Sequence, residues 1–222
     1  MKKSILALVC MLGIVTTAQA SPLTDFSQGK AALDLTWQQS KIGGTYAGTE
    51  GTFKSKGSLD WGVTVGLGNR MAVQYKNAYT KSADTLMTQW YGYTINASTW
   101  NQQYNLLYSL NQNCTLYTGL YDIRGRMDYV DASYVIRTDT KKIWQFGVIG
   151  QTKLADKVTL FGSIGVGKDL TDYSVGVAYK FAPQTEFNLL WHDTKVTSFR
   201  SQGGADMSLK NKGLGYGITY KF

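Results

Sequence analysis

The last ten residues, Gly213-Leu214-Gly215-Tyr216-Gly217-Ile218-Thr219-Tyr220-Lys221-Phe222, decide the fold. Their even positions are large and apolar, and their odd positions are small or polar. Because successive side chains of a β-strand point to opposite faces, this alternation predicts a strand with one apolar face and one polar face. A soluble protein can contain such a strand, so the rest of the chain must show what the apolar face meets.

The amino-terminal residues have the pattern of an export signal. Residues 1–3 are cationic, residues 5–17 are apolar, and residues 18–20 form a small-x-small cleavage site. This arrangement is typical of a secretory signal peptide, so we expect cleavage after Ala20 and exclude residues 1–20 from the fold.

An export signal combined with an alternating last strand that ends in Phe222 resembles the bacterial outer-membrane β-barrel proteins, a superfamily that includes porin-like and OmpA-like barrels. The resemblance implies location in the outer membrane. It also implies that the barrel-assembly machinery recognises the C-terminal strand as a partner.

The composition agrees with membrane-spanning strands. No stretch beyond residue 20 reaches the ~18–20 apolar residues that a membrane helix requires, so any span must be made by strands. Cys114 is the only cysteine after the cleavage site, which excludes an internal disulfide. Two prolines and 24 glycines, with 13% aromatic residues, favour long uninterrupted strands over a helical domain.

Alternation predicts an all-β fold, a transmembrane antiparallel up-and-down β-barrel of ten strands, over residues 30–222. Residues 21–29 are predicted to be a periplasmic N-terminal segment. Eight or twelve strands remain alternatives. The ten predicted ranges are 30–41, 57–67, 70–80, 98–110, 114–124, 142–154, 157–168, 172–181, 185–196 and 213–222.

The connections alternate in length. Short turns are predicted at 68–70, 111–114, 155–157 and 182–184, and long loops at 42–56, 81–97, 125–141 and 197–212; only 168–172 breaks the pattern. Short periplasmic turns and long external loops are typical of outer-membrane barrels.

Outward aromatic residues are expected to form two girdles at the lipid interfaces. The range 114–124 is ambiguous, because both of its faces carry apolar groups. We place Tyr117, Tyr121 and Ile123 outward there, since Asp122 and Arg124 on the lipid face would cost ~2–4 kcal/mol at the membrane midplane. The predicted girdle residues are Trp37, Trp61, Trp100, Trp144 and Trp191 toward the long loops, and Phe181, Tyr220 and Phe222 toward the short turns.

The opposite parity predicts a polar lumen with nearly balanced charge. A selective pore is expected to show one sign in excess, whereas balanced groups satisfy one another across strands. Ten strands also make a small barrel, near the size that side chains fill. We therefore expect no general porin, although inward glycines leave room for a narrow polar passage. The predicted lumenal residues are Asp34, Asp60, Asp122, Glu186, Lys76, Arg124, Lys180 and His192.

Two sequence patterns approach known functional motifs, one for phosphate binding and one for proteolysis, but each lacks a required residue or spacing. Residues 162–169 approach a phosphate-binding loop, but Asp169 stands where a hydroxyl is required and no helix pattern follows. Some outer-membrane barrels are proteases with an Asp-x-His pair. Here His192 and Asp193 are adjacent and face opposite sides of a strand, so they cannot form that pair. We expect no cofactor, no metal and no nucleic-acid partner.

The sequence predicts a monomeric, non-enzymatic barrel for envelope structure, surface interaction or limited diffusion of small solutes. The alternative is an outer-membrane enzyme, lipid-modifying or proteolytic, that uses His192 near the rim. Loop 81–97 contains the aromatic residues Trp90, Tyr91 and Tyr93. The loops are either solvated extensions of the strands or contact surfaces, with bases that meet lipopolysaccharide phosphates. These bases are Arg126, Arg137, Lys141, Lys142, Arg200, Lys210 and Lys212.

Overall fold

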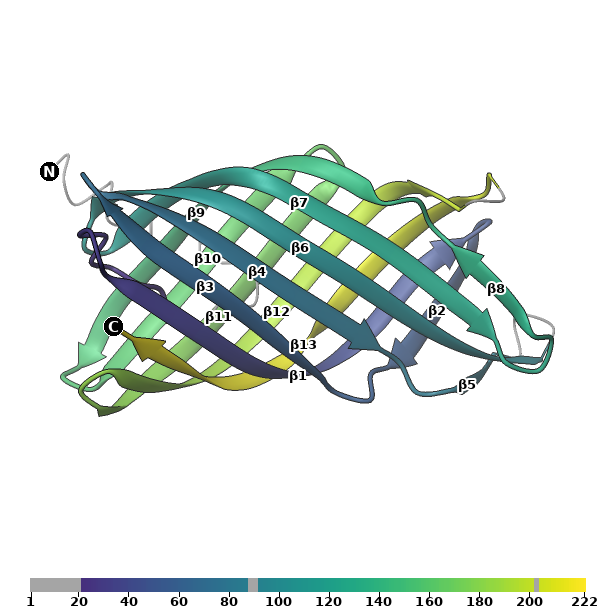
Figure 1. Cartoon of the computed structure of the whole chain (residues 1–222). Helices are drawn as coiled ribbons and strands as arrows, with labels where there is room; N and C mark the ends of the chain where they lie inside the picture. Colours follow the sequence, from purple (N-terminus) through teal and green to yellow (C-terminus); the bar gives the residue numbers. More distant parts are fainter. Residues whose placement is uncertain (1–20, 88–91, 202–203) are drawn as a thin grey trace, which may run out of the picture.

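The computed structural model describes residues 21–87, 92–201 and 204–222, and these form a closed antiparallel barrel (Figure 1). β1 pairs with β13, so the first and last strands close the wall, and Leu35 lies opposite Ile218. The ten strands of the wall are β1 (Ala31–Tyr46), β3 (Ser58–Gly68), β4 (Met71–Lys81), β6 (Tyr93–Asn111), β7 (Cys114–Tyr129), β9 (Lys141–Ala155), β10 (Val158–Gly167), β11 (Leu170–Ala182), β12 (Thr185–Arg200) and β13 (Asp206–Lys221).

The predicted ten-stranded barrel is confirmed, and each predicted range overlaps one strand of the wall. Several strands continue further toward the long loops than the sequence suggested. β6 begins at Tyr93 and β13 at Asp206, where the alternation had predicted strands from 98 and 213. Much of the predicted loop sequence is therefore strand. Among the described residues, no helix is long and apolar enough to cross a membrane.

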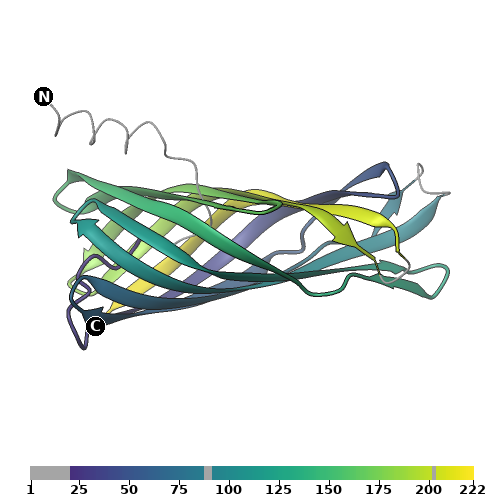
Figure 2. The same cartoon turned by 90° about the horizontal axis from the view of Figure 1, so that it is seen from above.

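Three short strands lengthen the wall at the long-loop end. These are β2 (Thr49–Lys54), β5 (Thr85–Met87) and β8 (Tyr134–Arg137), which pair with β1, β6 and β7 respectively. Bridges between Ser55 and Ser82 and between Thr138 and Ser201 join neighbouring hairpins. The wall therefore continues as a tube of β1, β2, β5, β6, β7, β8, β12 and β13, beyond the ends of β3, β4 and β9–β11 (Figures 1 and 2).

Turn lengths follow the predicted alternation. β3–β4, β6–β7, β9–β10 and β11–β12 are joined by tight turns at the end where the chain also terminates (Figure 1). In the β3–β4 turn, Asn69 and Arg70 have φ values of 52° and 64°, which suit the two-residue hairpin turn that matches strand twist. The β10–β11 connection is the tight exception at the opposite end, with Asp169 at φ 67°.

The facing predicted for β7 is wrong. Tyr117, Tyr121 and Ile123 are 4%, 1% and 4% exposed, whereas Leu116 and Leu120 are 40% and 36% exposed. The leucine side chains of β7 thus face the lipid, and its tyrosine rings fill the interior. Asp122 and Arg124 consequently lie on the outer face of the wall and are not lumenal.

Two contacts explain this reversal. A Cβ atom at Gly147 or Gly165 would collide with the Tyr117 side chain, so these glycines create the space that its ring occupies. On the outside, the Arg124 guanidinium stacks over Trp100 at 4.0 Å from the ring centroid. Arg124 therefore lies at the aromatic girdle, where a cation costs only about 0–1 kcal/mol, and not at the midplane.

Candidate functional site

Residues 21–29 fold back into the lumen at the short-turn end, and we refer to them as the N-terminal plug. Leu23 and Phe26 are buried there. The backbone N–H groups of Gly66 and Gly68 donate to the carbonyl oxygens of Lys30 and Phe26, both at 2.8 Å. The plug thus forms an apolar layer across one end of the lumen, packed against Ala32, Ala72, Leu107, Tyr117 and Ile149.

Ser21, the first described residue, is held by polar groups of the wall. Its backbone N–H donates to Asn188 Oδ1 at 3.2 Å, and its hydroxyl accepts from Lys221 Nζ at 3.2 Å. Lys221 also forms an ion pair with Glu186 at 2.9 Å. The predicted lumenal acid Glu186 therefore supports the plug. Lys180, opposite Glu186 in the register, is exposed at the same end.

Above the plug, the lumen contains a continuous chain of side-chain hydrogen bonds. Gln145 Nε2 donates to Asn105 Oδ1 at 2.8 Å and to Gln103 Oε1 at 3.4 Å. At one end of the chain, Thr194 Oγ1 donates to Asp172 Oδ1 at 2.6 Å. Because the chain crosses six strands, it fixes their mutual orientation. In order, its members are Thr64, Gln74, Asn105, Gln145, Gln103, Asp172 and Thr194.

Four predicted lumenal residues, Asp34, Asp60, Lys76 and His192, line one small cavity beside this chain. Asp34 and Lys76 lie on either side of Gly62 in the register, and Asp34 Oδ1 accepts a hydrogen bond from Thr219 Oγ1 at 2.8 Å. The cavity volume is about 50 Å³. Such a volume holds a few water molecules and no larger solute.

His192 lies inside the lumen and not near the rim. Its side chain is buried, and Nε2 is 3.3 Å from Ser40 Oγ. Asp193 projects from the outer face of the same strand, where it lies 3.3 Å from Lys210 Nζ. The sequence prediction that these two residues cannot act as a pair is confirmed.

Several lumenal residues were missed by the sequence analysis. Asp172, Gln103, Asn105 and Gln145 all belong to the hydrogen-bonded chain. Alternation could have identified them, since each neighbours an outward aromatic residue along its strand. Of the predicted lumenal residues, Asp122 and Arg124 lie outside, as described above.

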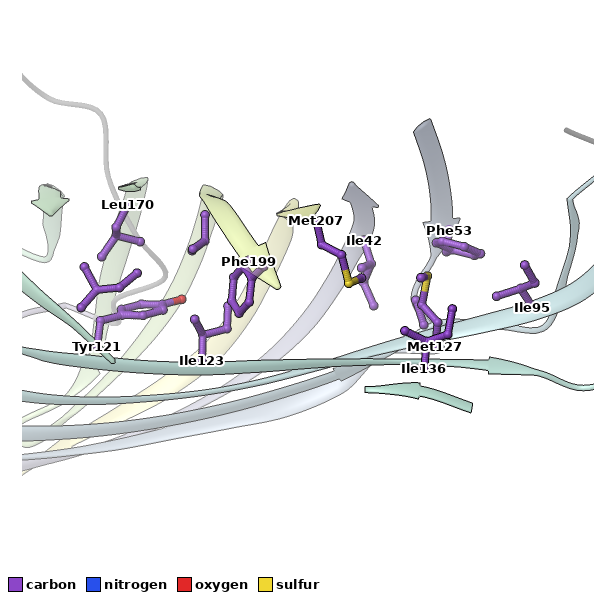
Figure 3. Packing of buried hydrophobic residues seen from close by; sticks show 13 residues of the cluster. Ile42, Phe53, Ile95, Tyr121, Ile123, Met127, Ile136, Leu170, Phe199 and Met207 are labelled. Carbon is purple, nitrogen blue, oxygen red and sulfur yellow. The ribbon is translucent and has the colours of Figure 1, made fainter. Parts of the chain in front are cut away.

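A second apolar layer fills the lumen toward the long loops (Figure 3). Val196, Ile95 and Tyr121 are among its most deeply buried members. The upper tube has fewer strands than the barrel below it, and a narrower tube is filled by its own side chains. We refer to this layer as the upper core. It comprises Ile42, Phe53, Ile95, Ala97, Tyr121, Ile123, Met127, Ile136, Ile143, Leu170, Val196, Phe199 and Met207.

An aromatic cluster covers the upper core at the tip. Tyr129 lies 5.7 Å from Tyr93 and 5.9 Å from Tyr134, measured between ring centroids. Tyr134 is 58% exposed, and Val130 beside it is also exposed. Tyr93 is the described member of the predicted aromatic loop; Trp90 and Tyr91 lie outside the described residues.

A hollow of about 780 Å³ lies beside the ends of β8, β12 and β13, and its lining includes Phe199 and Met207 of the upper core. Lys141 forms part of its floor. Its ammonium group donates to Asp169 Oδ2 at 2.9 Å and to the carbonyl oxygens of Thr197 and Ser198 at 2.7 and 3.0 Å. The Lys141 hydrogen bond holds the pKa of Asp169 below its ordinary value. Lys141 thereby ties the low β10–β11 turn to β12.

The eight predicted girdle residues all occupy outward positions. Tyr79 and Trp100 contact each other edge to face at 5.8 Å, as do Tyr220 and Phe222 at 4.8 Å. Trp191 is half-buried between its register partners Val175 and Leu214. The exposed members are Trp37, Trp61, Trp100, Trp144, Phe181, Tyr220 and Phe222.

The described residues contain no group of three or more His, Cys, Asp or Glu side chains that could bind a metal ion. Residues 162–169, which approach a phosphate-binding loop in sequence, form most of β10 and the following turn. No helix follows them, so no helix N-terminus is available for a phosphate.

No family model and no curated protein matches the chain. Among solved structures, it is similar to the outer membrane protease OmpT from Escherichia coli, with a TM-score of 0.58 and 14% identity over 93% of this chain and 100% of that one. The translocator domain of the autotransporter NalP from Neisseria meningitidis gives a TM-score of 0.50 and 10% identity over 89% of this chain and 90% of that one. The attachment invasion locus protein Ail of Yersinia pestis gives 0.41 and 11%, over 88% and 99%. At these identities the likeness concerns the fold alone, and the fold is that of an outer-membrane β-barrel with transmembrane strands.

Proposed function

We propose that the protein is a closed barrel that serves envelope structure or surface interaction, and not solute diffusion. The observation that carries this proposal is the pair of apolar layers, the N-terminal plug and the upper core, on either side of the polar lumen. A hydrated solute would lose its hydrogen bonds to water at both layers without replacing them.

The tube beyond the ten-stranded barrel supports a role at the surface. Short turns of outer-membrane barrels face the periplasm, so the tube and its aromatic cluster project outside the cell. Exposed aromatic residues are enriched where proteins bind partners. We propose that Tyr93, Tyr129 and Tyr134 form the contact surface for such a partner.

We also infer that the barrel is monomeric. Its ten long strands close through β1 and β13, so the described ten-stranded part of the wall offers no unpaired edge to a second copy. Sheet edges are a frequent route to association, and closure removes that route.

The enzymatic alternative requires a base near the rim together with a nucleophile. The burial of His192 beneath the upper core argues against that role, because an external lipid or peptide could not reach its ring. Replacing His192 with Ala should leave lipid and peptide hydrolysis by outer-membrane preparations unchanged. A loss of either activity would favour the enzyme.

Conductance across planar bilayers tests the proposal directly. We expect no sustained current steps from purified barrel whose folded state is verified in the same sample by a heat-dependent shift in electrophoretic mobility. A resolved, persistent step would refute the closed barrel. The double variant Leu23→Ala, Phe26→Ala is the informative comparison: it removes one layer, and it should still not conduct because the upper core remains.

A further inference from the structure

Five lysines occupy neighbouring outward positions on four adjacent strands, and we refer to them as the lysine ladder. Lys41 of β1 is in register with Lys54 of β2 on one side and with Lys212 of β13 on the other. One step further from the membrane, Lys210 of β13 is in register with Lys195 of β12.

This arrangement places like charges directly opposite one another, which destabilises an antiparallel sheet. Asp193 is in register with Lys212 and lies 3.3 Å from Lys210 Nζ, so it offsets one of the five positive charges. The remaining positive charge lowers the stability of the isolated wall. An anion bound from outside would neutralise these lysines, so that the same cluster would stabilise the wall instead of destabilising it.

The ladder also surrounds a position without a side chain. Gly43 is in register with Lys210 and Thr52, and it is two residues from Lys41 on the same face. A Cβ atom at Gly43 would meet nothing closer than Thr52 Oγ1 at 3.6 Å. The outer surface at Gly43 is therefore open, with lysine side chains on either side of it.

The height of the ladder identifies its environment. Lys41 follows the girdle residue Trp37 by four residues, and Lys195 follows Trp191 by four. At about 3.3 Å per residue and a strand tilt of roughly 40°, four residues rise about 10 Å above the girdle. This is the level of lipid headgroups and lies above the hydrocarbon.

We propose that the lysine ladder binds the phosphate groups of an outer-leaflet lipid, the lipid A part of lipopolysaccharide. Ammonium groups bind phosphate as strong point charges, and a membrane-anchored phosphate meets the ladder at the height where its side chains project. The loop bases that the sequence had suggested for this role contribute only Lys210 and Lys212. The inference does not depend on whether the lumen is closed.

The test compares two triple variants in detergent. The ladder variant is K41Q/K54Q/K212Q, and the control is K153Q/K157Q/K180Q, which removes the same charge from exposed positions at the short-turn end. The probes are lipid A and the same lipid without its phosphates. Wild type and control should bind lipid A equally and the dephosphorylated lipid weakly. The ladder variant should bind lipid A about a hundredfold more weakly.

Thermal unfolding provides a readout that a purely structural role would not predict. Without lipid, the ladder variant should be at least as stable as wild type, because opposed like charges have been removed. Lipid A should raise the Tm of wild type and control, and leave that of the ladder variant nearly unchanged. Equal affinity of wild type for phosphorylated and dephosphorylated lipid would overturn the proposal. So would equal lipid A binding by the two variants, or saturation of wild type by a soluble sulfated polysaccharide but not by lipid A.

Discussion

Gly68 donates its backbone N–H to the carbonyl oxygen of Phe26 at 2.8 Å, and this bond ties the N-terminal plug to the β3–β4 turn. The neighbouring Gly66 lies so close to the plug that a Cβ atom there would approach the Phe26 carbonyl carbon to 2.8 Å and the Ser27 oxygen to 2.5 Å. The wall and the plug are therefore fitted to each other through two glycines.

The variant Gly66→Val should displace the plug, because backbone atoms of the plug occupy the space that its side chain requires. The measurement is the reactivity of Thr36→Cys, a lumenal position, toward a charged thiol reagent in a Cys114→Ala background. We expect slow reaction with the plug in place and at least roughly tenfold faster reaction after its displacement, as a local opening of about 1.4 kcal/mol implies. Val65→Leu, which enlarges an outward side chain, is the control and should not change the rate. Equal reactivity in all three backgrounds would show that the plug does not cover the lumen.

Reversal of the predicted β7 facing leads to a second prediction. Leu120→Arg places a cation on the lipid face, in register with the girdle residue Trp144. It should destabilise the folded barrel in bilayers by an amount between the roughly 0–1 kcal/mol of an interfacial cation and the roughly 2–4 kcal/mol of one at the midplane. Tyr121→Phe removes only a hydroxyl from the interior and should have a much smaller effect. The free energies of unfolding follow from urea titrations in lipid vesicles, read by tryptophan fluorescence. An unchanged free energy of unfolding for Leu120→Arg would mean that Leu120 faces the lumen and Tyr121 the lipid, as the sequence predicts.

Different parts of this structure were predictable to different degrees. In β13 the residues Leu214, Tyr216, Ile218 and Tyr220 are all exposed as the alternation required, because each strand carries its own two-residue period. In β7 both faces are apolar, so the facing of Tyr117 was decided by glycines of β9 and β10 that local sequence does not reveal.

The two-residue alternation of the sequence also does not predict the two apolar layers, the N-terminal plug and the upper core. Leu23 and Phe26 are isolated apolar residues in a segment too short to show any periodicity. Phe53 and Ile136 lie in ranges that were read as loops, and their burial depends on β2 and β8 lengthening the wall. Which side chains fill the lumen depends on contacts between strands that are distant in the sequence. The direction in which most side chains face and the lengths of the turns depend on the local sequence.

The lumenal hydrogen-bonded chain should be sensitive to the loss of its central amide. Gln145→Leu leaves the side-chain oxygens of Asn105 and Gln103 without their donor, and each unsatisfied buried group costs about 1–3 kcal/mol. We expect a lower free energy of unfolding and an unchanged, non-conducting barrel. Gln151→Leu is the matched control, since its amide donates to the exposed carbonyl oxygen of Gln112. If the two variants lost equal stability, the chain would contribute nothing beyond an ordinary surface hydrogen bond.

The ion pair between Lys141 and Asp169 predicts a pH dependence at the long-loop end. The hydrogen bond from Lys141 favours the charged carboxylate and lowers the pKa of Asp169 from its ordinary value of 3.8. The stabilisation that this ion pair gives the folded state is therefore complete above the ordinary pKa of Asp. It is lost as the pH falls through the lowered pKa of Asp169 in the folded state.

Titration of carbon-13-labelled Asp carboxyl groups by NMR should give a midpoint for Asp169 below 3.8 in wild type. Lys141→Met should return the midpoint toward that value, and Lys142→Met, which removes an exposed neighbouring cation, should not. Below the midpoint, the Thr197 N–H bonded to the Asp169 carbonyl oxygen should lose protection, since the β10–β11 turn is then released from β12. An Asp169 midpoint unchanged by Lys141→Met would mean that the two side chains do not pair in solution.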